Sequence, residues 1–202
     1  MSGHSKLGIA LDIDDTIADS SRACIAHMLE KFSHTHLSAD EIRTRYGYPS
    51  LVPEWQLPEC QTMLGKLYQD NDFYEQVVPL PGAVEHVHQL ASLVPIRCYI
   101  TSRMTHLHDL TQRWLKQYGF PEAELICRSP EITDADWKIR YLVKNKIAIL
   151  GLVDNELYVP SNVSFDFHLF ELVEYQKISP EHPTLEVCKD WEEVITRVKA
   201  SL

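Results

Sequence analysis

Short apolar runs alternate with amphipathic segments along most of the chain. The runs have the length of buried strands and lack polar alternation, which is typical of parallel sheets. The segments between them repeat apolar residues at helical spacing. The predicted strands are residues 7–13, 95–103, 123–129, 147–155 and 167–175, and the predicted helices are residues 21–32, 81–94, 105–120, 134–145 and 190–201. This order predicts an α/β fold with a parallel sheet flanked by helices on both faces.

Residues 20–80 depart from this alternation. They contain no convincing strand, a capping box at Ser38 and Glu41, and three prolines within YPSLVPEWQLPE. A single crossover helix between the first two strands would need far fewer residues. We therefore expect a core domain of residues 1–19 plus 81–202 and a mostly helical cap of residues 20–80. The alternative is that these helices pack on an edge of the sheet.

The composition is that of one substantial globular domain. Hydrophobic residues make up 45% of the 202 residues and charged residues 24%, which is enough for a large core. The formal net charge of −10 argues against a nucleic-acid polymer or an anionic membrane as partner. The five cysteines form no CxxC pair, the start MSGHSKLGIALDIDD lacks the apolar stretch of a signal peptide, and no run could span a membrane. We therefore expect a cytoplasmic protein.

Acidic residues follow the first predicted strand directly, in ALDIDDTIADS. In a parallel α/β sheet, ligands bind beyond the carboxyl ends of the strands. Asp12 and Asp14 are two residues apart, so strand geometry would direct both carboxylates to the same side. Carboxylates this close need a cation or a shared proton, and Mg²⁺ prefers oxygen ligands. A solvated acidic turn explains two acids equally well, so the other strand ends must decide.

Three further polar groups occupy comparable positions. The second predicted strand ends in Thr101 and Ser102, whose hydroxyls and backbone amides at a helix entrance would bind an anion. The fourth ends in Asp154, and Lys138 lies on the helix before it. Singly, these residues indicate an N-cap, an acidic turn and a solvated lysine. Together they predict a site at one edge of the sheet.

These four elements, in this order, resemble the motifs of the haloacid dehalogenase (HAD) superfamily of phosphohydrolases. The match runs through DIDDT (12–16), YITS (99–102), Lys138 and VDN (153–155), and it covers essentially the whole chain as a scaffold. The resemblance implies a Rossmann-like HAD core. The gap between the first two motifs is where the superfamily carries its C1 caps, whereas the stretch from Thr101 to Lys138 is too short for a C2 cap.

Within the superfamily, the chain resembles the 5'(3')-deoxyribonucleotidase-like family. The resemblance rests on overall length, the LSADEI segment, the Thr-Ser pair and the late CKDWEEV helix. It fails at three places. Asp15 replaces a glycine common in those enzymes, Asn155 stands where a second acid often follows Asp154, and residues 167–183 do not resemble an arginine- and proline-bearing loop.

The resemblance implies a Mg²⁺-dependent phosphatase that hydrolyses a small phosphate monoester, such as a nucleoside monophosphate, through an aspartyl-phosphate. Asp12 would be the nucleophile and Asp14 the general acid and base. The phosphoryl group would be bound by Thr101, the Ser102 amide and Lys138, and the Mg²⁺ ion by Asp12, the Asp14 backbone carbonyl and Asp154. The partner would be a small phosphorylated metabolite.

Neighbouring residues allow two interpretations each. Asp15 would cap the following backbone or act directly, and Asp19 would lie in a solvated turn or meet the substrate. Arg103 follows the Thr-Ser pair and is a candidate for substrate contact. The cap aromatics would stack on a base or form the cap's own small core: these are Tyr46, Tyr48 and Trp55.

Two other functions are open on the residues alone. A non-catalytic HAD-fold module would bind a ligand in the same cleft, and Asn155, which weakens the last motif, is the residue that favours it. Phosphoryl transfer or phosphonate cleavage would change the chemistry, with Lys66 as the candidate for a Schiff-base lysine in the cap.

Overall fold

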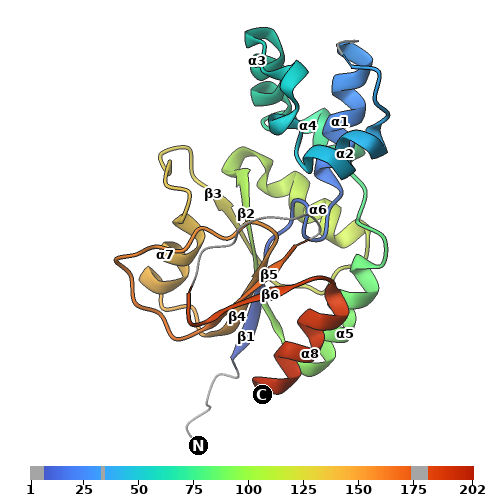
Figure 1. The fold of residues 1–202 in the computed structure, drawn as a ribbon. Helices are drawn as coiled ribbons and strands as arrows, with labels where there is room; N and C mark the ends of the chain where they lie inside the picture. The colour runs from blue at the N-terminus through green and yellow to red at the C-terminus, as the bar shows by residue number, and fades with distance from the viewer. Residues whose placement is uncertain (1–6, 33–34, 174–181) are drawn as a thin grey trace, which may run out of the picture.

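The computed structural model describes residues 7–32, 35–173 and 182–202, and a parallel sheet flanked by helices forms its centre (Figure 1). The strands are β1 (Gly8–Leu11), β2 (Ile96–Met104), β3 (Glu124–Arg128), β4 (Ile149–Asp154), β5 (His168–Leu172) and β6 (Leu185–Cys188). The helices are α1 (Ser20–Lys31), α2 (Ala39–Tyr46), α3 (Pro58–Leu67), α4 (Asn71–Gln76), α5 (Ala83–Leu93), α6 (His108–Gln117), α7 (Trp137–Lys144) and α8 (Trp191–Ala200). Three short 3₁₀ turns are η1 (Pro49–Leu51), η2 (Pro53–Trp55) and η3 (Thr105–Leu107).

The strand order is β3-β2-β1-β4-β5-β6, and every neighbouring pair is parallel. The predicted α/β fold is confirmed. Strand β1 lies between β2 and β4, and Leu11 pairs with Tyr99 on one side and with Val153 on the other. The carboxyl ends of these three strands therefore meet at one edge, which places the residues after Leu11 between the other two strand ends.

Two apolar layers hold the helices on the sheet. Side chains alternate along β1, so Ile9 and Leu11 join the layer under α5, α6 and α8, while Ala10 joins the layer under α7. All three are fully buried. Because both faces are covered, β1 and β4 consist almost entirely of apolar residues.

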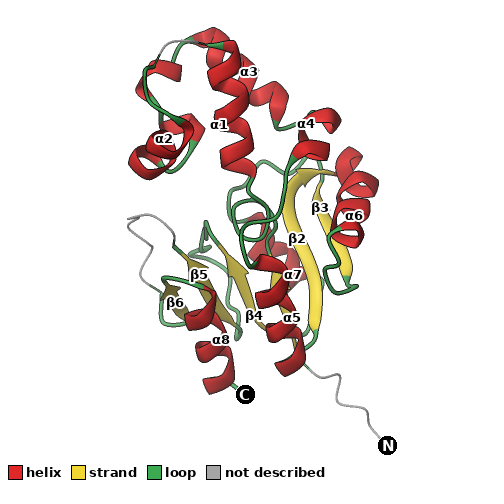
Figure 2. Ribbon diagram, turned by 90° about the vertical axis from the view of Figure 1, so that its right-hand side faces the viewer, coloured by secondary structure: helices red, strands yellow, loops and turns green. Residues whose placement is uncertain are grey.

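Helices α1 to α4 form a group beyond the carboxyl edge of the sheet, where α4 packs against α6 (Figures 1 and 2). The two connections to this group pair with each other: Asp19 N donates to Val78 O (2.8 Å), and Leu80 N donates to Ile17 O (2.9 Å). The predicted capping box at the start of α2 is confirmed. Trp55 is fully buried, so it contributes to the apolar interior of this group.

The sequence prediction differs from the structure at the sheet edges. Strand β6 was not predicted, because its four residues LEVC are only partly buried and form no apolar run. Part of the predicted strand 167–175 lies outside the described residues. All five cysteines are free and four are buried. None of the helices in the described ranges has the length and apolarity needed to cross a membrane.

Gly151 tests how tightly β4 and β5 pack. A Cβ at this position would lie 2.6 Å from Cε2 of Phe170 and 2.9 Å from the carbonyl oxygen of His168. We expect Gly151→Ala to lower the free energy of unfolding by about 1–3 kcal/mol because the neighbours must shift. Urea denaturation followed by circular dichroism measures this change.

The matched control is Gly65→Ala in α3, where a Cβ would meet nothing within 4 Å. There we expect unchanged or slightly higher stability, by up to roughly 1 kcal/mol, since alanine is the better helix former. Equal effects of the two substitutions would contradict close packing at Gly151.

Candidate active site

A tight turn follows β1 and presents the acidic cluster. Asp12 N donates to Val153 O (2.9 Å), which prolongs the pairing with β4, and the amides of Ile17 and Ala18 both donate to Ile13 O (2.9 Å). Asp15 has a φ of 57°, a left-handed conformation that aspartate tolerates better than most residues. Its carboxylate accepts from the backbone amide (2.8 Å) and the hydroxyl (2.5 Å) of Ser21. Asp15 therefore caps the following backbone.

Asp12, Lys138 and Asp154 meet at the ends of β1 and β4. Lys138 Nζ donates to Asp12 Oδ1 (2.6 Å) and to Asp154 Oδ2 (2.7 Å), and both carboxylate side chains are at most 5% exposed. Lys138 belongs to the first turn of α7, which carries the ammonium group across to the strand ends. The structure thus brings together three residues that are far apart in the sequence.

One ammonium group shared by two buried carboxylates leaves a net negative charge. Burial raises the pKa of Asp12 to about 7; Lys138 opposes this rise, and the neighbouring acids add to it. Burial also raises the pKa of Asp154 against the pull of Lys138. Burial by itself would lower the pKa of Lys138, but the two carboxylates outweigh it and the pKa is raised. The cluster therefore favours an additional positive charge or a proton.

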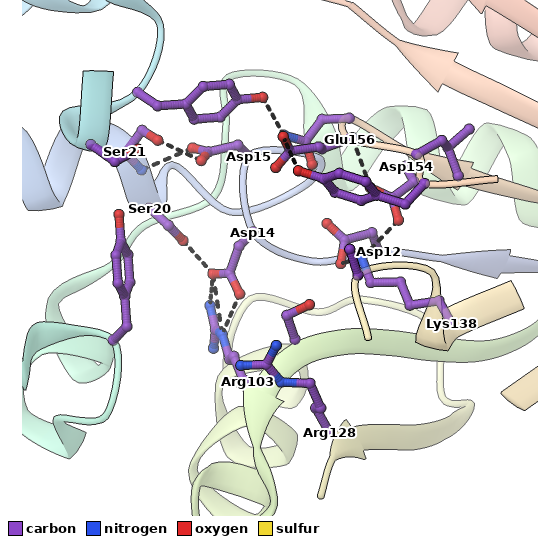
Figure 3. Close-up of a pocket in the computed structure, with 18 of the residues that line it drawn as sticks. Asp12, Asp14, Asp15, Ser20, Ser21, Arg103, Arg128, Lys138, Asp154 and Glu156 are labelled. Atoms are coloured by element: carbon purple, nitrogen blue, oxygen red, sulfur yellow. Dashed lines mark hydrogen bonds and ion pairs between the residues drawn. The ribbon is translucent and has the colours of Figure 1, made fainter. Parts of the chain in front are cut away.

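Asp14 lines the same cleft as Asp12 but interacts with different neighbours (Figure 3). Its carboxylate accepts from Arg103 Nη2 (2.8 Å), Arg103 Nε (3.1 Å), Thr101 Oγ1 (3.3 Å) and the hydroxyl of Ser20. Burial alone would raise the pKa of Asp14, but the charge and hydrogen bonds of Arg103 lower it below the ordinary value. The two acids, predicted to point to one side, therefore turn towards β4 and β2 respectively.

Arg103 is held inside the protein. Its side chain is fully buried, its guanidinium carbon lies 4.2 Å from the ring centroid of Tyr74 and 5.6 Å from that of Trp114, and Nη1 donates to Thr111 Oγ1 (3.3 Å). Cation–π contacts and the ion pair with Asp14 fix this geometry. Arg103 therefore positions Asp14, and because it also lines the cleft, its contact with substrate stays a prediction.

Thr101 and Ser102 lie within β2 and not at a helix entrance. Strand β2 continues to Met104, which pairs with Arg128 on β3, and α6 begins only at His108 after the turn η3. The predicted helix entrance at this pair is wrong because pairing with β3 extends the strand. Thr101 contacts Asp14, and the Ser102 hydroxyl accepts from the indole of Trp137 (3.4 Å) and lines the cleft.

Asn155 joins the oxygen-rich edge of the site. In one amide orientation, Oδ1 accepts from Thr16 Oγ1 (3.1 Å) and Nδ2 donates to the Tyr48 hydroxyl (3.0 Å). With oxygen and nitrogen exchanged, Nδ2 donates to the Asp14 carbonyl (3.0 Å) and to Asp12 Oδ2 (3.3 Å), while Oδ1 accepts from Tyr48. In the first orientation, Asn155 Oδ1 faces two other oxygens, Asp12 Oδ2 and the Asp14 carbonyl. In the second, the amide N–H groups of Asn155 face these oxygens and bond to them.

These contacts test whether the residues suit a divalent cation. Within the described ranges, no group of three or more His, Cys, Asp and Glu side chains is arranged to hold a metal. Two buried carboxylates and the Asp14 carbonyl nevertheless provide oxygen donors at one point, beside the Asn155 amide. Hard cations such as Mg²⁺ bind oxygen ligands of these kinds together with water. The donor set therefore fits Mg²⁺, although it has fewer side-chain acids than a fully acidic site.

A cleft of about 940 Å³ lies over these residues and is lined from both sides. The helical group contributes Arg43, Tyr46, Tyr48 and other residues, and the strand ends contribute the acids and Lys138. Arg43 pairs with Asp19, and both are buried. The predicted solvated turn at Asp19 is therefore wrong.

No sequence pattern predicts that Arg43 or the hydroxyl of Tyr48 lies near the strand ends. Their positions depend on how the helical group docks, which a linear pattern does not encode. Tyr46 and Tyr48 line the cleft, whereas Trp55 does not.

Comparison with protein families gave one match over most of the chain. The model described as "5' nucleotidase, deoxy (Pyrimidine), cytosolic type C protein" matches residues 6–148. A search of curated proteins found no match.

Several solved structures share the fold. A haloacid dehalogenase-like family hydrolase from Streptococcus pneumoniae is 16% identical, with a TM-score of 0.58, over 96% of this chain and 98% of that one. A HAD family hydrolase from Deinococcus radiodurans, solved with bound phosphate and sodium, is 12% identical with a TM-score of 0.53 and coverages of 96% and 95%. A haloacid dehalogenase-like hydrolase from Xanthomonas campestris is 14% identical with a TM-score of 0.52 and coverages of 97% and 96%.

The charge cluster predicts a pH-dependent stability that Asp12 controls. Its pKa of about 7 lies above the ordinary value of 3.8, so the stability contributed by the protonated form is full below about pH 4 and is lost as the pH rises to about 7. Asp12→Asn resembles the protonated form at every pH. Its stability advantage over the natural protein should therefore grow by on the order of 2–4 kcal/mol between about pH 4 and pH 8.

Urea denaturation at both pH values, in buffers free of divalent cations, measures this difference. Asp109→Asn serves as the control because the Asp109 side chain is 88% exposed. Its free energy of unfolding, relative to that of the natural protein, should change by no more than about 0.5 kcal/mol between the two pH values. A pH-independent effect of Asp12→Asn would contradict the raised pKa.

Proposed function

Because this chain belongs to the 5' nucleotidase, deoxy (pyrimidine), cytosolic type C family, a family of HAD-type phosphohydrolases, we propose that it is a Mg²⁺-dependent phosphatase. The proposed substrate is a small phosphate monoester, with nucleoside monophosphates as the first candidates. The proposed reaction passes through an aspartyl-phosphate on Asp12.

The meeting of Asp12, Lys138 and Asp154 is the observation that carries this proposal. The shared ammonium group (2.6 and 2.7 Å) lies in the cleft that Asp14 and Ser102 also line, and Thr101 bonds to Asp14. This arrangement supports Asp12 as nucleophile, Asp14 as proton carrier, and Lys138 and the Thr-Ser pair as phosphate ligands. Phosphoryl transfer depends mainly on such positioning and charge neutralisation. A solvated acidic turn would leave these carboxylates exposed, whereas Asp12 and Asp154 are buried.

Asp12 is the proposed nucleophile. One carboxylate oxygen attacks phosphorus, the bond between phosphorus and the leaving oxygen breaks, and the phosphoryl group is carried on Asp12 until water displaces it. Lys138 remains beside Asp12 and binds a phosphoryl oxygen, while Thr101 and Ser102 supply hydroxyl and amide donors. The lysine also prevents Asp12 and Asp154 from repelling each other.

Asp14 is the proposed general acid and base. It protonates the leaving oxygen and later accepts a proton from the attacking water. The ion pair with Arg103 lowers its pKa in the free protein. A bound phosphate dianion would raise that pKa again because it places negative charge beside the carboxylate. Asp14 would therefore gain a proton when substrate enters.

The proposed metal ligands are Asp12, the Asp14 backbone carbonyl and Asp154, with Asn155 as a neutral fourth donor. When bound, Mg²⁺ neutralises the repulsion between the acidic residues and the anionic substrate. Asn155 is included because its amide lies 3.3 Å from Asp12 Oδ2 and 3.0 Å from the Asp14 carbonyl. Rotation of the amide would bring its oxygen to a bound cation.

Residues 20–80 are proposed to be a cap that closes the cleft over the core of residues 1–19 plus 81–202. Arg43 and Tyr48 support this role, since they reach Asp19 and Asn155 from the helical group. Closure would exclude water from the site. Lys66 does not line the main cleft, which disfavours Schiff-base chemistry there.

Asp12→Asn tests the nucleophile. Hydrolysis of p-nitrophenyl phosphate and nucleoside monophosphates should fall by at least about 10³-fold, while Asp109→Asn keeps full activity because Asp109 is exposed on α6. Mass spectrometry of acid-quenched natural enzyme should find the phosphoryl group on the peptide that contains Asp12. Substantial turnover by Asp12→Asn would refute the assignment.

Asn155→Asp tests the metal site without relying on activity. An added carboxylate beside Asp12 and Asp154 should tighten Mg²⁺ binding, by on the order of tenfold, because affinity rises with ligand charge. Isothermal titration calorimetry with Mg²⁺ measures it. Asn145→Asp, at the exposed end of α7, should leave the affinity unchanged. An equal Mg²⁺ affinity in all three proteins would exclude Asn155 from the metal site.

A further inference from the structure

The cleft contains cationic side chains that differ in their partners. Four of them line it: Arg43, Arg103, Arg128 and Lys138. Three are paired with carboxylates: Arg43 with Asp19, Arg103 with Asp14, and Lys138 with Asp12 and Asp154. Their charges are thus already largely neutralised. Arg128 differs from the other three.

Arg128 Nε is shielded from water and has no hydrogen-bond partner among the residues that the structure describes. None of the ion pairs found in these same ranges includes Arg128. A charged donor that loses water without gaining an acceptor is unfavourable. A ligand that brings an anionic oxygen to the guanidinium group would remove this penalty. Arg128 is therefore a candidate residue for binding an anionic ligand.

The position of Arg128 indicates which part of a substrate it would meet. It ends β3 and pairs in register with Met104, two residues after Ser102 on β2. Lys138 and Asp154 lie on the other side of Asp12, towards β4. Arg103 lies on β2, the strand that pairs with β3, whereas Lys138 lies on α7. Arg128 and Lys138 therefore lie towards opposite sides of the cleft.

Asp14 defines the direction of the leaving group. Its carboxylate is drawn towards β2 by Arg103 (2.8 Å) and Thr101 (3.3 Å). A proton donor must lie within hydrogen-bond reach of the oxygen that it protonates. The leaving group would therefore lie on the β2 side of Asp12, and β3 with Arg128 is the next strand in that direction.

We propose that Arg128 binds a second anionic group, carried by the leaving group of the substrate. The preferred substrates are then phosphate monoesters that bear a carboxylate or a second phosphate in addition to the phosphoryl group transferred to Asp12. The planar guanidinium group suits both anions, since it donates two parallel hydrogen bonds to either. This inference rests on the proposed phosphatase function.

Matched substrate pairs test the inference. One pair is phosphoglycolate and ethyl phosphate, which differ in the carboxylate; the other is a nucleoside 3',5'-bisphosphate and the corresponding 5'-monophosphate. For Arg128→Gln we expect kcat/KM to fall at least about tenfold for the doubly anionic member, and less than about threefold for its partner. For each pair we divide the loss in kcat/KM for the doubly anionic member by the loss for its partner. The pair with the larger ratio identifies whether Arg128 binds a carboxylate or a phosphate. The singly anionic member also reports whether the variant is folded.

Arg113→Gln is the matched control, because Arg113 lies exposed on α6 outside the cleft. It should leave all four rates unchanged. An equal loss on both members of each pair would overturn the proposal and assign Arg128 to the transferred phosphoryl group. Unchanged rates for Arg128→Gln would overturn it as well.

Binding separates this inference from the proposed function. Isothermal titration calorimetry with Asp12→Asn, which does not depend on turnover, compares the two members of each pair. We expect tighter binding of the doubly anionic member, and loss of that preference in the Asp12→Asn, Arg128→Gln double variant. No preference in Asp12→Asn would overturn the inference even if the natural protein hydrolyses monoesters. A preference without hydrolysis would instead refute the phosphatase function alone.

Discussion

The site depends on one ammonium group that two buried carboxylates share. Lys138 lies within 2.7 Å of both Asp12 and Asp154, and without it two negative charges would face each other inside the protein. Removing one partner from a buried ion cluster is strongly destabilising because the remaining charge is uncompensated. When both Asp12 and Asp154 are ionised, Lys138 neutralises only one of the two negative charges. The charge balance of the cluster thus favours the binding of a cation at this point.

The parallel register brings these groups together, and much of it could be predicted from the sequence. Acids directly after apolar strands indicate a ligand site at a sheet edge, and the pairings of Leu11 with Tyr99 and Val153 place those ends side by side. The strand over 95–103 was predicted almost to its end at Met104, but the turn η3 that separates it from α6, and so removes Thr101 and Ser102 from the helix entrance, could not be predicted. Likewise, the pairing of Arg103 with Asp14 could not be predicted, because sequence does not reveal that Tyr74 and Trp114 enclose Arg103.

Two acids separated by one residue have opposite electrostatic environments. Burial raises the pKa of Asp12 to about 7, whereas burial of Asp14 is outweighed by Arg103 and its pKa is lowered. Environments that separate two pKa values in this way assign different roles to chemically identical groups. In the sequence the two aspartates are equivalent. Their difference arises because the turn after β1 directs one side chain to β4 and the other to β2.

The helical group influences the same turn through two contacts, of which one is buried and one is partly buried. Arg43 pairs with Asp19 where the chain leaves the core, and Tyr48 bonds to Asn155 at the end of β4. Asn155 can turn either its amide nitrogen or its oxygen towards Asp12 and the Asp14 carbonyl, and Tyr48 can accept or donate accordingly. The Asn155–Tyr48 hydrogen bond therefore links the acidic cluster to the helices above it.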